Sequence, residues 1–232
     1  MTGVAKQGAI VVFAKAPRAG LVKTRMCPPL TSEQAASLYE HMLDDVLEAT
    51  ADFAAALGLD PLVAIYPADG VRDVLPRTPG VYRIIAQRGR DLSQRMDWAA
   101  AEVAASGASP ILLRGSDSPV LSQACVEDAL RALRESDVVL CPDADGGYNL
   151  VGLCRPRPGL FDHAMSTESV LDDTLAAAEA MGLRATLLEP GFDIDTAADL
   201  ALLERARAAG QADLCPRTLA YLDERGLWSP AC

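Results

Sequence analysis

Short runs of apolar, often β-branched residues alternate along the chain with longer segments rich in Ala and Leu. The short runs predict strands, and the longer segments repeat apolar residues at the spacing of helices that cover a core. Strands are predicted at residues 9–14, 61–66, 81–86, 110–114, 138–141, 148–153 and 185–188. Helices are predicted at residues 32–57, 69–75, 92–106, 123–136, 170–181 and 197–209, with a last helix near 214–225.

This order of elements predicts an α/β fold of three layers, α/β/α, with a mainly parallel sheet covered on both faces. Only the turn D-A-D-G-G and its neighbours separate the strands at 138–141 and 148–153. One strand should therefore run antiparallel, which makes the sheet mixed. With 232 residues and no linker-like stretch, the chain is predicted to form a single domain over residues 1–232.

Composition narrows the choice of partners. Half of the residues are hydrophobic and 23% are charged, which is typical of a globular core, and the formal net charge is −11. This charge opposes binding to nucleic acid or to an anionic membrane surface, so a small-molecule substrate is expected. No apolar run approaches membrane-spanning length, and the six scattered cysteines contain no C-x-x-C pair. We therefore expect a cytoplasmic protein with reduced thiols.

The loop after the first strand gathers positive charge in this acidic chain. It reads K-A-P-R-A-G-L-V-K-T-R over residues 15–25 and contains Lys15, Arg18, Lys23 and Arg25. Ligands of open α/β sheets bind at the carboxyl ends of strands, where these cations and the backbone N–H groups around Gly20 suit phosphate oxygens. The alternative is a solvated basic loop. The loop is neither a Walker A loop nor a G-x-G-x-x-G segment, so those two nucleotide-binding classes are excluded.

A second loop, G-S-D-S-P at residues 115–119, directly follows the strand predicted at 110–114. Asp117 is placed there to hold Mg²⁺ or Mn²⁺, since both prefer oxygen ligands, and the small Ser116 lets a nucleotide approach. A purely structural interpretation competes with this one. Ser118 can be the N-cap of the next helix with Pro119 at its first position.

A third loop, G-F-D-I-D-T at residues 191–196, follows the last predicted strand. Asp193 and Asp195 alternate across one residue, so in an extended segment both point to the same side. Together with Asp117 they predict a site of three carboxylates, which a divalent cation would neutralise. In the alternative, Thr196 and Asp199 form a capping box and Asp195 is only a charge in the first helical turn.

The segment D-A-D-G-G-Y-N-L at residues 143–150 contains the turn between the two predicted antiparallel strands. Asp-Gly-Gly is typical of a hairpin turn, and that can be its whole role. In the functional interpretation, Gly146 and Gly147 let the backbone approach the nucleotide or the acceptor, and Tyr148 or Asn149 supplies a polar contact. Three carboxylates of this region are candidates for a general base, and spacing does not choose among them: Asp143, Asp145 and Glu168.

Taken in order, these motifs resemble a bacterial family described as glycosyltransferases with the GT-A type nucleotide-diphospho-sugar transferase fold. The resemblance rests on V-K-T-R-M-C-P-P-L-T, G-S-D-S-P, D-A-D-G-G-Y-N-L-V-G-L, S-T-E-S-V and F-D-I-D-T-A-A-D-L. It covers nearly the whole chain. Some members of that family are named as arsenosugar-biosynthesis glycosyltransferases, so the resemblance implies a GT-A type fold and a nucleotide-sugar donor.

The motifs are also similar, more distantly, to the 2-phospho-lactate or phosphoenolpyruvate guanylyltransferases. That similarity implies that Asp117, Asp193 and Asp195 hold Mg²⁺ and that Lys23 and Arg25 contact phosphates. In this chain a Tyr, at position 148, precedes the Asn where the guanylyltransferases usually carry Thr.

Three functional hypotheses follow. The first is metal-dependent glycosyl transfer from a nucleotide sugar to a small-molecule acceptor. The second is nucleotidyl transfer from a nucleoside triphosphate to a phosphorylated small acceptor, with release of pyrophosphate. In either reaction Lys23, Asp117 and Asp145 are the candidate catalytic residues. The third hypothesis is a nucleotide-binding module without turnover.

Overall fold

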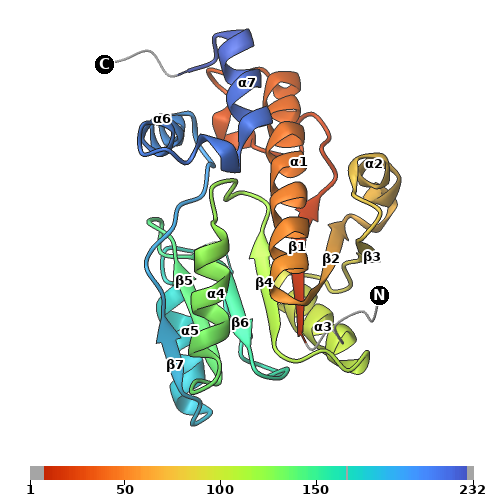
Figure 1. Cartoon of the computed structure of the whole chain (residues 1–232), viewed down its shortest axis with the longest axis vertical. Helices are drawn as coiled ribbons and strands as arrows, with labels where there is room; N and C mark the ends of the chain where they lie inside the picture. The colour runs from red at the N-terminus through yellow and green to blue at the C-terminus, as the bar shows by residue number, and fades with distance from the viewer. Residues whose placement is uncertain (1–7, 166, 229–232) are drawn as a thin grey trace.

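The computed structural model describes residues 8–165 and 167–228. Within these residues a seven-stranded sheet has the order β3-β2-β1-β4-β6-β5-β7 (Figure 1). The strands are β1 (Gly8–Lys15), β2 (Leu59–Tyr66), β3 (Arg83–Ala86), β4 (Ile111–Gly115), β5 (Val138–Pro142), β6 (Tyr148–Leu153) and β7 (Ala185–Leu187). Strand β6 pairs antiparallel with both β4 and β5, and the other pairs are parallel. The predicted mixed, mainly parallel sheet is confirmed.

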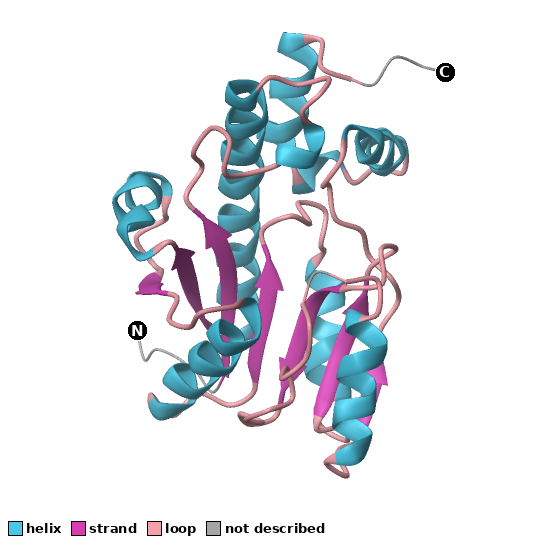
Figure 2. Ribbon diagram, turned by 180° about the vertical axis from the view of Figure 1, so that it is seen from behind, coloured by secondary structure: helices cyan, strands magenta, loops and turns pink. Residues whose placement is uncertain are grey.

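Helices cover both faces of this sheet (Figure 2). They are α1 (Ser32–Leu57), α2 (Val71–Val74), α3 (Leu92–Ala105), α4 (Gln123–Ala132), α5 (Val170–Ala180), α6 (Leu200–Ala208) and α7 (Pro216–Arg225). Helices α3 and α5 pack on one face, and α1 and α4 pack on the other. Side chains of β1 alternate between the faces, with Val11 in the first core and Ile10 and Val12 in the second. The predicted three-layer α/β/α architecture is therefore confirmed.

Local sequence sets the limits of the longest helix. The Thr31 hydroxyl accepts from the Gln34 backbone N–H and the Gln34 side chain accepts from the Thr31 N–H, which is a capping box. Gly58 ends α1 in the left-handed conformation, with φ at 69°.

Several predicted bounds differ from the structure; the helix predicted at residues 123–136, for example, ends at Ala132. The helix predicted at residues 69–75 is a four-residue helix between two 3₁₀ turns, η2 (Ala68–Gly70) and η3 (Leu75–Arg77). Gly70 and Pro76 flank α2, and both residue types disfavour a longer regular helix. The strand predicted at residues 81–86 begins two residues later, at Arg83.

No helix among the described residues is long and apolar enough to cross a membrane.

One hydrophobic cluster, which we call the loop-anchoring cluster, lies at the end of the sheet to which the site loops project. It contains Met26 and Leu30 from the segment that directly follows the basic loop, Val120 just after G-S-D-S-P, and Ile194 from the loop after β7. These side chains pack with buried residues of α1, α6 and α7, namely Leu38, Met42, Leu200, Leu203, Leu219 and Leu222. Apolar burial thus fixes the three loops relative to one another.

A buried carboxylate attaches α7 to α1. Asp45 of α1 accepts hydrogen bonds from the Thr218 backbone N–H at 2.8 Å and from its hydroxyl at 2.7 Å, and from the Arg217 N–H at 3.1 Å. Its side chain is 0% exposed. Cys215, the N-cap residue of α7, gives no side-chain hydrogen bond to the helix. Asp45 of another helix therefore accepts from the free N–H groups at the start of α7 in its place.

We expect Asp45→Ala to lower the free energy of unfolding by about 1–3 kcal/mol, because it leaves buried donors of α7 without an acceptor. Urea denaturation measures the change. The control is Glu48→Ala, which removes an exposed partner of the same Arg217 and should change stability by no more than about 0.5 kcal/mol. Equal effects of the two substitutions would contradict this role of Asp45.

Candidate functional site

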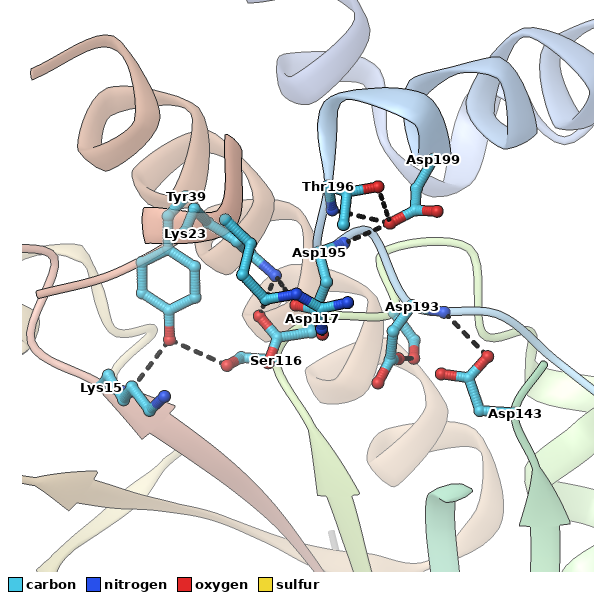
Figure 3. Close-up of polar contacts among 12 residues, drawn as sticks. Lys15, Lys23, Tyr39, Ser116, Asp117, Asp143, Asp193, Asp195, Thr196 and Asp199 are labelled. Atoms are coloured by element: carbon cyan, nitrogen blue, oxygen red, sulfur yellow. Dashed lines mark hydrogen bonds and ion pairs between the residues drawn. The ribbon is translucent and has the colours of Figure 1, made fainter. Parts of the chain in front are cut away.

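Three loops meet at one edge of the sheet. They are the basic loop after β1, the G-S-D-S-P loop after β4, and the loop after β7 that carries Asp193 and Asp195. Strands β1 and β4 are parallel neighbours, so their carboxyl ends lie side by side. The Ile194 N–H donates to the Asp117 carbonyl at 2.9 Å and joins the second loop to the third. Figure 3 shows the polar side chains that the loops bring together.

Lys23 lies at the centre of this site. Its ammonium forms ion pairs with the carboxylate of Asp117 and, at 3.0 Å, with Oδ1 of Asp195 (Figure 3). The side chain is 3% exposed, whereas Arg25, whose Nη1 is 3.5 Å from Asp195 Oδ2, is 64% exposed. The Lys23 backbone has φ at 48°, a left-handed conformation that costs a non-glycine residue free energy. Tertiary contacts therefore hold this lysine in place.

The ion pairs change the titration of both partners. Burial alone would lower the pKa of Lys23, but the carboxylates of Asp117 and Asp195 raise it above its usual value. Burial would raise the pKa of Asp195, but Lys23 and Arg25 lower it below its usual value. Lys23 is therefore a permanent cation in this state.

Asp193 faces a different set of groups. The Ser118 hydroxyl donates to its carboxylate, and its backbone N–H donates to Asp143 Oδ1 at 3.3 Å. Burial raises the pKa of Asp193 well above its usual range, and the negative charges of Asp117 and Asp143 raise it further. This carboxylate therefore lacks a sufficient counter-charge.

These contacts leave the three predicted metal-binding carboxylates with other partners. Among residues 8–165 and 167–228, no three His, Cys, Asp or Glu side chains are gathered as a metal ion requires. Asp195 pairs with Lys23, and Asp193 with Ser118. The surplus of carboxylate charge at Asp193 beside Asp117 nevertheless fits a hard divalent cation. Mg²⁺ or Mn²⁺ stays a prediction, and its binding requires Lys23 to leave part of this cluster.

Of the other residues predicted to contact phosphates, only some lie close to Lys23 and its carboxylates. Lys15 is exposed, and its backbone N–H donates to the Tyr39 hydroxyl at 2.9 Å. Ser116 is buried, and its hydroxyl is 2.8 Å from the same Tyr39 oxygen. Gly20 lies in an exposed part of the loop with φ at 76°. Arg18 is paired with Asp69 and Asp73, so it is turned toward the α2 region.

The hairpin between β5 and β6 contains the remaining predicted residues. Asp145 is exposed and accepts from the Gly147 N–H at 3.2 Å, and no hydrogen bond or ion pair between described residues joins it to Lys23 or Asp117. A Cβ on Gly146, whose φ is 86°, would lie 2.0 Å from the Glu168 carbonyl oxygen. The turn therefore requires glycine there for structural reasons. Asn149 is buried, and its Oδ1 has no partner among the described residues.

The structure tests two of the helix-capping roles that the sequence offered as alternatives to function. Ser118 is not a helix N-cap: α4 begins at Gln123, and the Ser122 hydroxyl caps it by accepting from the Cys125 N–H at 3.3 Å. That interpretation is wrong because the hydroxyl of Ser118 is used by Asp193. The capping box of Thr196 and Asp199 is confirmed.

Sequence reasoning missed two buried polar residues of the site. Tyr39 joins the ends of β1 and β4 through its hydroxyl, and burial raises its pKa to about 12. Its position in the apolar pattern of α1 hides it among core residues. Arg114 is 1% exposed and donates to the Ser118 carbonyl at 2.8 Å, behind Asp193. A charged residue inside the apolar strand I-L-L-R-G was the signal that could have identified it.

Comparison with known proteins agrees with this fold. A family described as "Uncharacterized protein conserved in bacteria (DUF2064)" matches residues 49–167, which is just over half of the chain. The chain belongs to this family. A nucleotide-diphospho-sugar transferase candidate from Desulfovibrio desulfuricans G20, known from a crystal structure, is 30% identical with a TM-score of 0.84. The match covers 95% of the DUF2064 chain and 96% of that protein.

Two further relatives extend the comparison. A phosphoenolpyruvate guanylyltransferase from Chloroflexus aggregans is 27% identical over 199 residues, 84% of the present chain and 93% of the relative. A cytidylyltransferase from Leptospira borgpetersenii shares the fold, with a TM-score of 0.59 at 11% identity over 99% of both chains. These proteins are transferases, the enzyme class that the sequence predicts, and the resemblance to nucleotide-diphospho-sugar transferases and guanylyltransferases is confirmed.

With a chelator present, Asp193→Asn should raise the free energy of unfolding at neutral pH. The pKa of Asp193 is higher in the folded than in the unfolded chain, so the wild type loses stability as the pH rises from the ordinary carboxyl pKa through the raised one. Asn carries no charge and avoids this loss, so its advantage should shrink toward about pH 4. Urea denaturation across this pH range measures it.

The matched control is Asp145→Asn, which neutralises an exposed turn residue and should change stability by no more than about 0.5 kcal/mol. An Asp193→Asn advantage that is equally large at both ends of the pH range would contradict the raised pKa.

Proposed function

We propose that this DUF2064 protein is a transferase that acts on a substrate activated by a nucleoside phosphate, with nucleotidyl transfer as the favoured reaction. The observation that carries the proposal is the buried ammonium of Lys23, held between Asp117 and Asp195 at the carboxyl edge of the sheet. Lys23 is buried and has a left-handed backbone, which costs free energy. This acidic protein therefore keeps a fixed cation at the edge where ligands of α/β sheets bind.

Residues of the basic loop would bind and orient the phosphates. The exposed Arg25 guanidinium offers forked hydrogen bonds to phosphate oxygens, and the exposed Lys15 adds a second charge at the end of β1. Lys23 would turn its ammonium from one carboxylate to the phosphate oxygen that becomes more negative as the bond breaks. Substrate binding therefore has to rearrange the loop, since Lys23 is 3% exposed before it.

Asp117 and Asp193, with Asp195 once Lys23 has moved, would hold Mg²⁺ or Mn²⁺. The bound cation supplies charge that neutralises and orients the phosphates of the substrate. The Ser118 hydroxyl keeps the Asp193 carboxylate oriented, and Arg114 behind it fixes the Ser118 backbone. A carboxylate of the hairpin region remains the candidate base: Asp145, or Asp143, which is closer to Asp193.

Nucleotidyl transfer is favoured by the guanylyltransferase relative, which matches over 93% of its own length. A nucleoside triphosphate also carries more negative charge than a nucleotide sugar, and so is a better match for a loop with three cations at the carboxyl edge of the sheet, Lys15, Lys23 and Arg25. Glycosyl transfer is the second candidate. It is supported by the Desulfovibrio relative, which matches over 95% of the chain.

The product distinguishes the two reactions. With nucleoside triphosphates, phosphorylated small acceptors and Mg²⁺ or Mn²⁺, nucleotidyl transfer releases pyrophosphate. With nucleotide sugars, glycosyl transfer releases a nucleoside diphosphate. We expect pyrophosphate, and Asp117→Asn should lower its rate by about 10²-fold or more. Glu224→Gln, an exposed acidic residue of α7, is the control and should keep the wild-type rate. Ligand binding that survives Asp117→Asn unchanged, without any turnover, would instead indicate a binding module.

Two substitutions in the basic loop test the assignment of phosphate contacts. Lys23→Gln should lower kcat/KM for the triphosphate by about 10²–10³-fold, because it removes the cation that faces the developing charge. Arg18→Gln removes a cation from the same loop that is paired with Asp69 and Asp73, and should leave kcat/KM nearly unchanged. Equal losses in steady-state kinetics would mean that the loop acts only through its total charge.

A further inference from the structure

Two thiols meet beside the loop that carries Asp193. Cys125 lies in the first turn of α4 and Cys141 lies on β5, and their sulfur atoms are 3.7 Å apart. Both line a cavity of about 350 Å³ that is also bounded by residues 188–192. We propose that Cys125 and Cys141 are an oxidisable pair, which a hydroperoxide converts into an intramolecular disulfide. This inference does not depend on the proposed transferase activity.

Cys125 has the surroundings of a reactive thiol. It is only partly buried, and it is the third residue of α4, where the helix terminus favours a negative charge. Its contact with Cys141 lowers the pKa of the Cys125 thiol, and the charge of the buried Arg114 lowers it further, although burial opposes this. The cavity gives a small oxidant a route to this sulfur.

Cys141 has the surroundings of a partner that reacts second. It is 2% exposed, and its S–H donates to the Glu189 carbonyl oxygen at 3.2 Å. The contact with Cys125 and burial both raise the pKa of Cys141, so this thiol stays protonated until Cys125 is oxidised. When two neighbouring thiols differ in reactivity in this way, the first sulfur is oxidised and the second then forms a disulfide with it.

The chemistry balances without any further reactant. The Cys125 thiol loses its proton, the thiolate attacks the peroxide oxygen, and the O–O bond breaks. Cys125 becomes a sulfenic acid, and the leaving alkoxide or hydroxide takes up the released proton to become an alcohol or water. Cys141 sulfur then attacks the Cys125 sulfur, the S–O bond breaks, and the proton of Cys141 leaves with the hydroxyl as water. Two thiols are oxidised by two electrons, and one peroxide is reduced.

The disulfide would also act on the loop after β7. The segment from Leu188 to Gly191 is attached to β5 by three hydrogen bonds: Leu188 N–H to the Leu140 carbonyl at 2.8 Å, Gly191 N–H to the Pro142 carbonyl at 2.9 Å, and the S–H of Cys141 to Glu189. Oxidation removes the third of these, since a disulfide has no S–H donor. Residues 188–193 should therefore exchange amide hydrogens faster in the oxidised protein.

The test treats the full chain with hydrogen peroxide, alkylates the remaining thiols and maps the peptides without reductant. We expect a peptide pair joined between Cys125 and Cys141, with a mass lower by two hydrogen atoms. Cys125→Ser should abolish this linkage, and Cys141→Ser should leave a sulfenic acid at Cys125 that dimedone labels. Cys154→Ser is the control: its sulfur donates to the Leu133 and Ser136 carbonyls, so the linkage should form as in the wild type.

Full alkylation of Cys125 and Cys141 after peroxide has oxidised other thiols would overturn the proposal. So would a linkage that joins either cysteine mainly to another partner. A disulfide that forms without faster exchange at residues 188–193, measured by mass spectrometry, would overturn the coupling to the Asp193 loop while leaving the modification site intact.

Discussion

The buried ammonium of Lys23 balances the negative charge on which the geometry of this edge depends. Asp117, Asp143, Asp193 and Asp195 converge from three segments of the chain, and such carboxylates repel one another strongly once water is removed. Lys23 compensates Asp117 and Asp195 directly, which leaves the raised pKa of Asp193 as the mark of the remaining imbalance. Binding of a divalent cation would relieve the same imbalance.

Apolar packing offsets the free-energy cost of this arrangement of charges. The loop-anchoring cluster takes side chains from, or directly after, all three loops and packs them against α1, α6 and α7. Asp45 adds a polar attachment between α1 and α7 on the same side of the molecule. The strained backbone of Lys23 and the repulsion among carboxylates can persist because this packing surrounds them.

Much of the fold was predictable because its signals are local. Strands such as β1 are apolar runs buried on both faces, and α1 carries its capping box and terminal glycine in the sequence. The loops that form the site were predictable because they come directly after strands. The left-handed backbone of Lys23 and its burial were not predictable, since tertiary packing imposes them. Ser118 and Ser122 precede the same helix with similar sequence signals, and only the position of Asp193 shows which hydroxyl is free to cap it.

The reversed direction of β6 divides the rim of the sheet into two parts that can diverge separately. Strands β1 and β4 reach this rim at their ends, whereas β6 starts there, immediately after the hairpin at residues 143–147. A surface turn tolerates insertion and exchange more readily than a buried strand does. Changes of sequence or length in this hairpin would therefore leave the ends of β1 and β4, and the loops that follow them, in place.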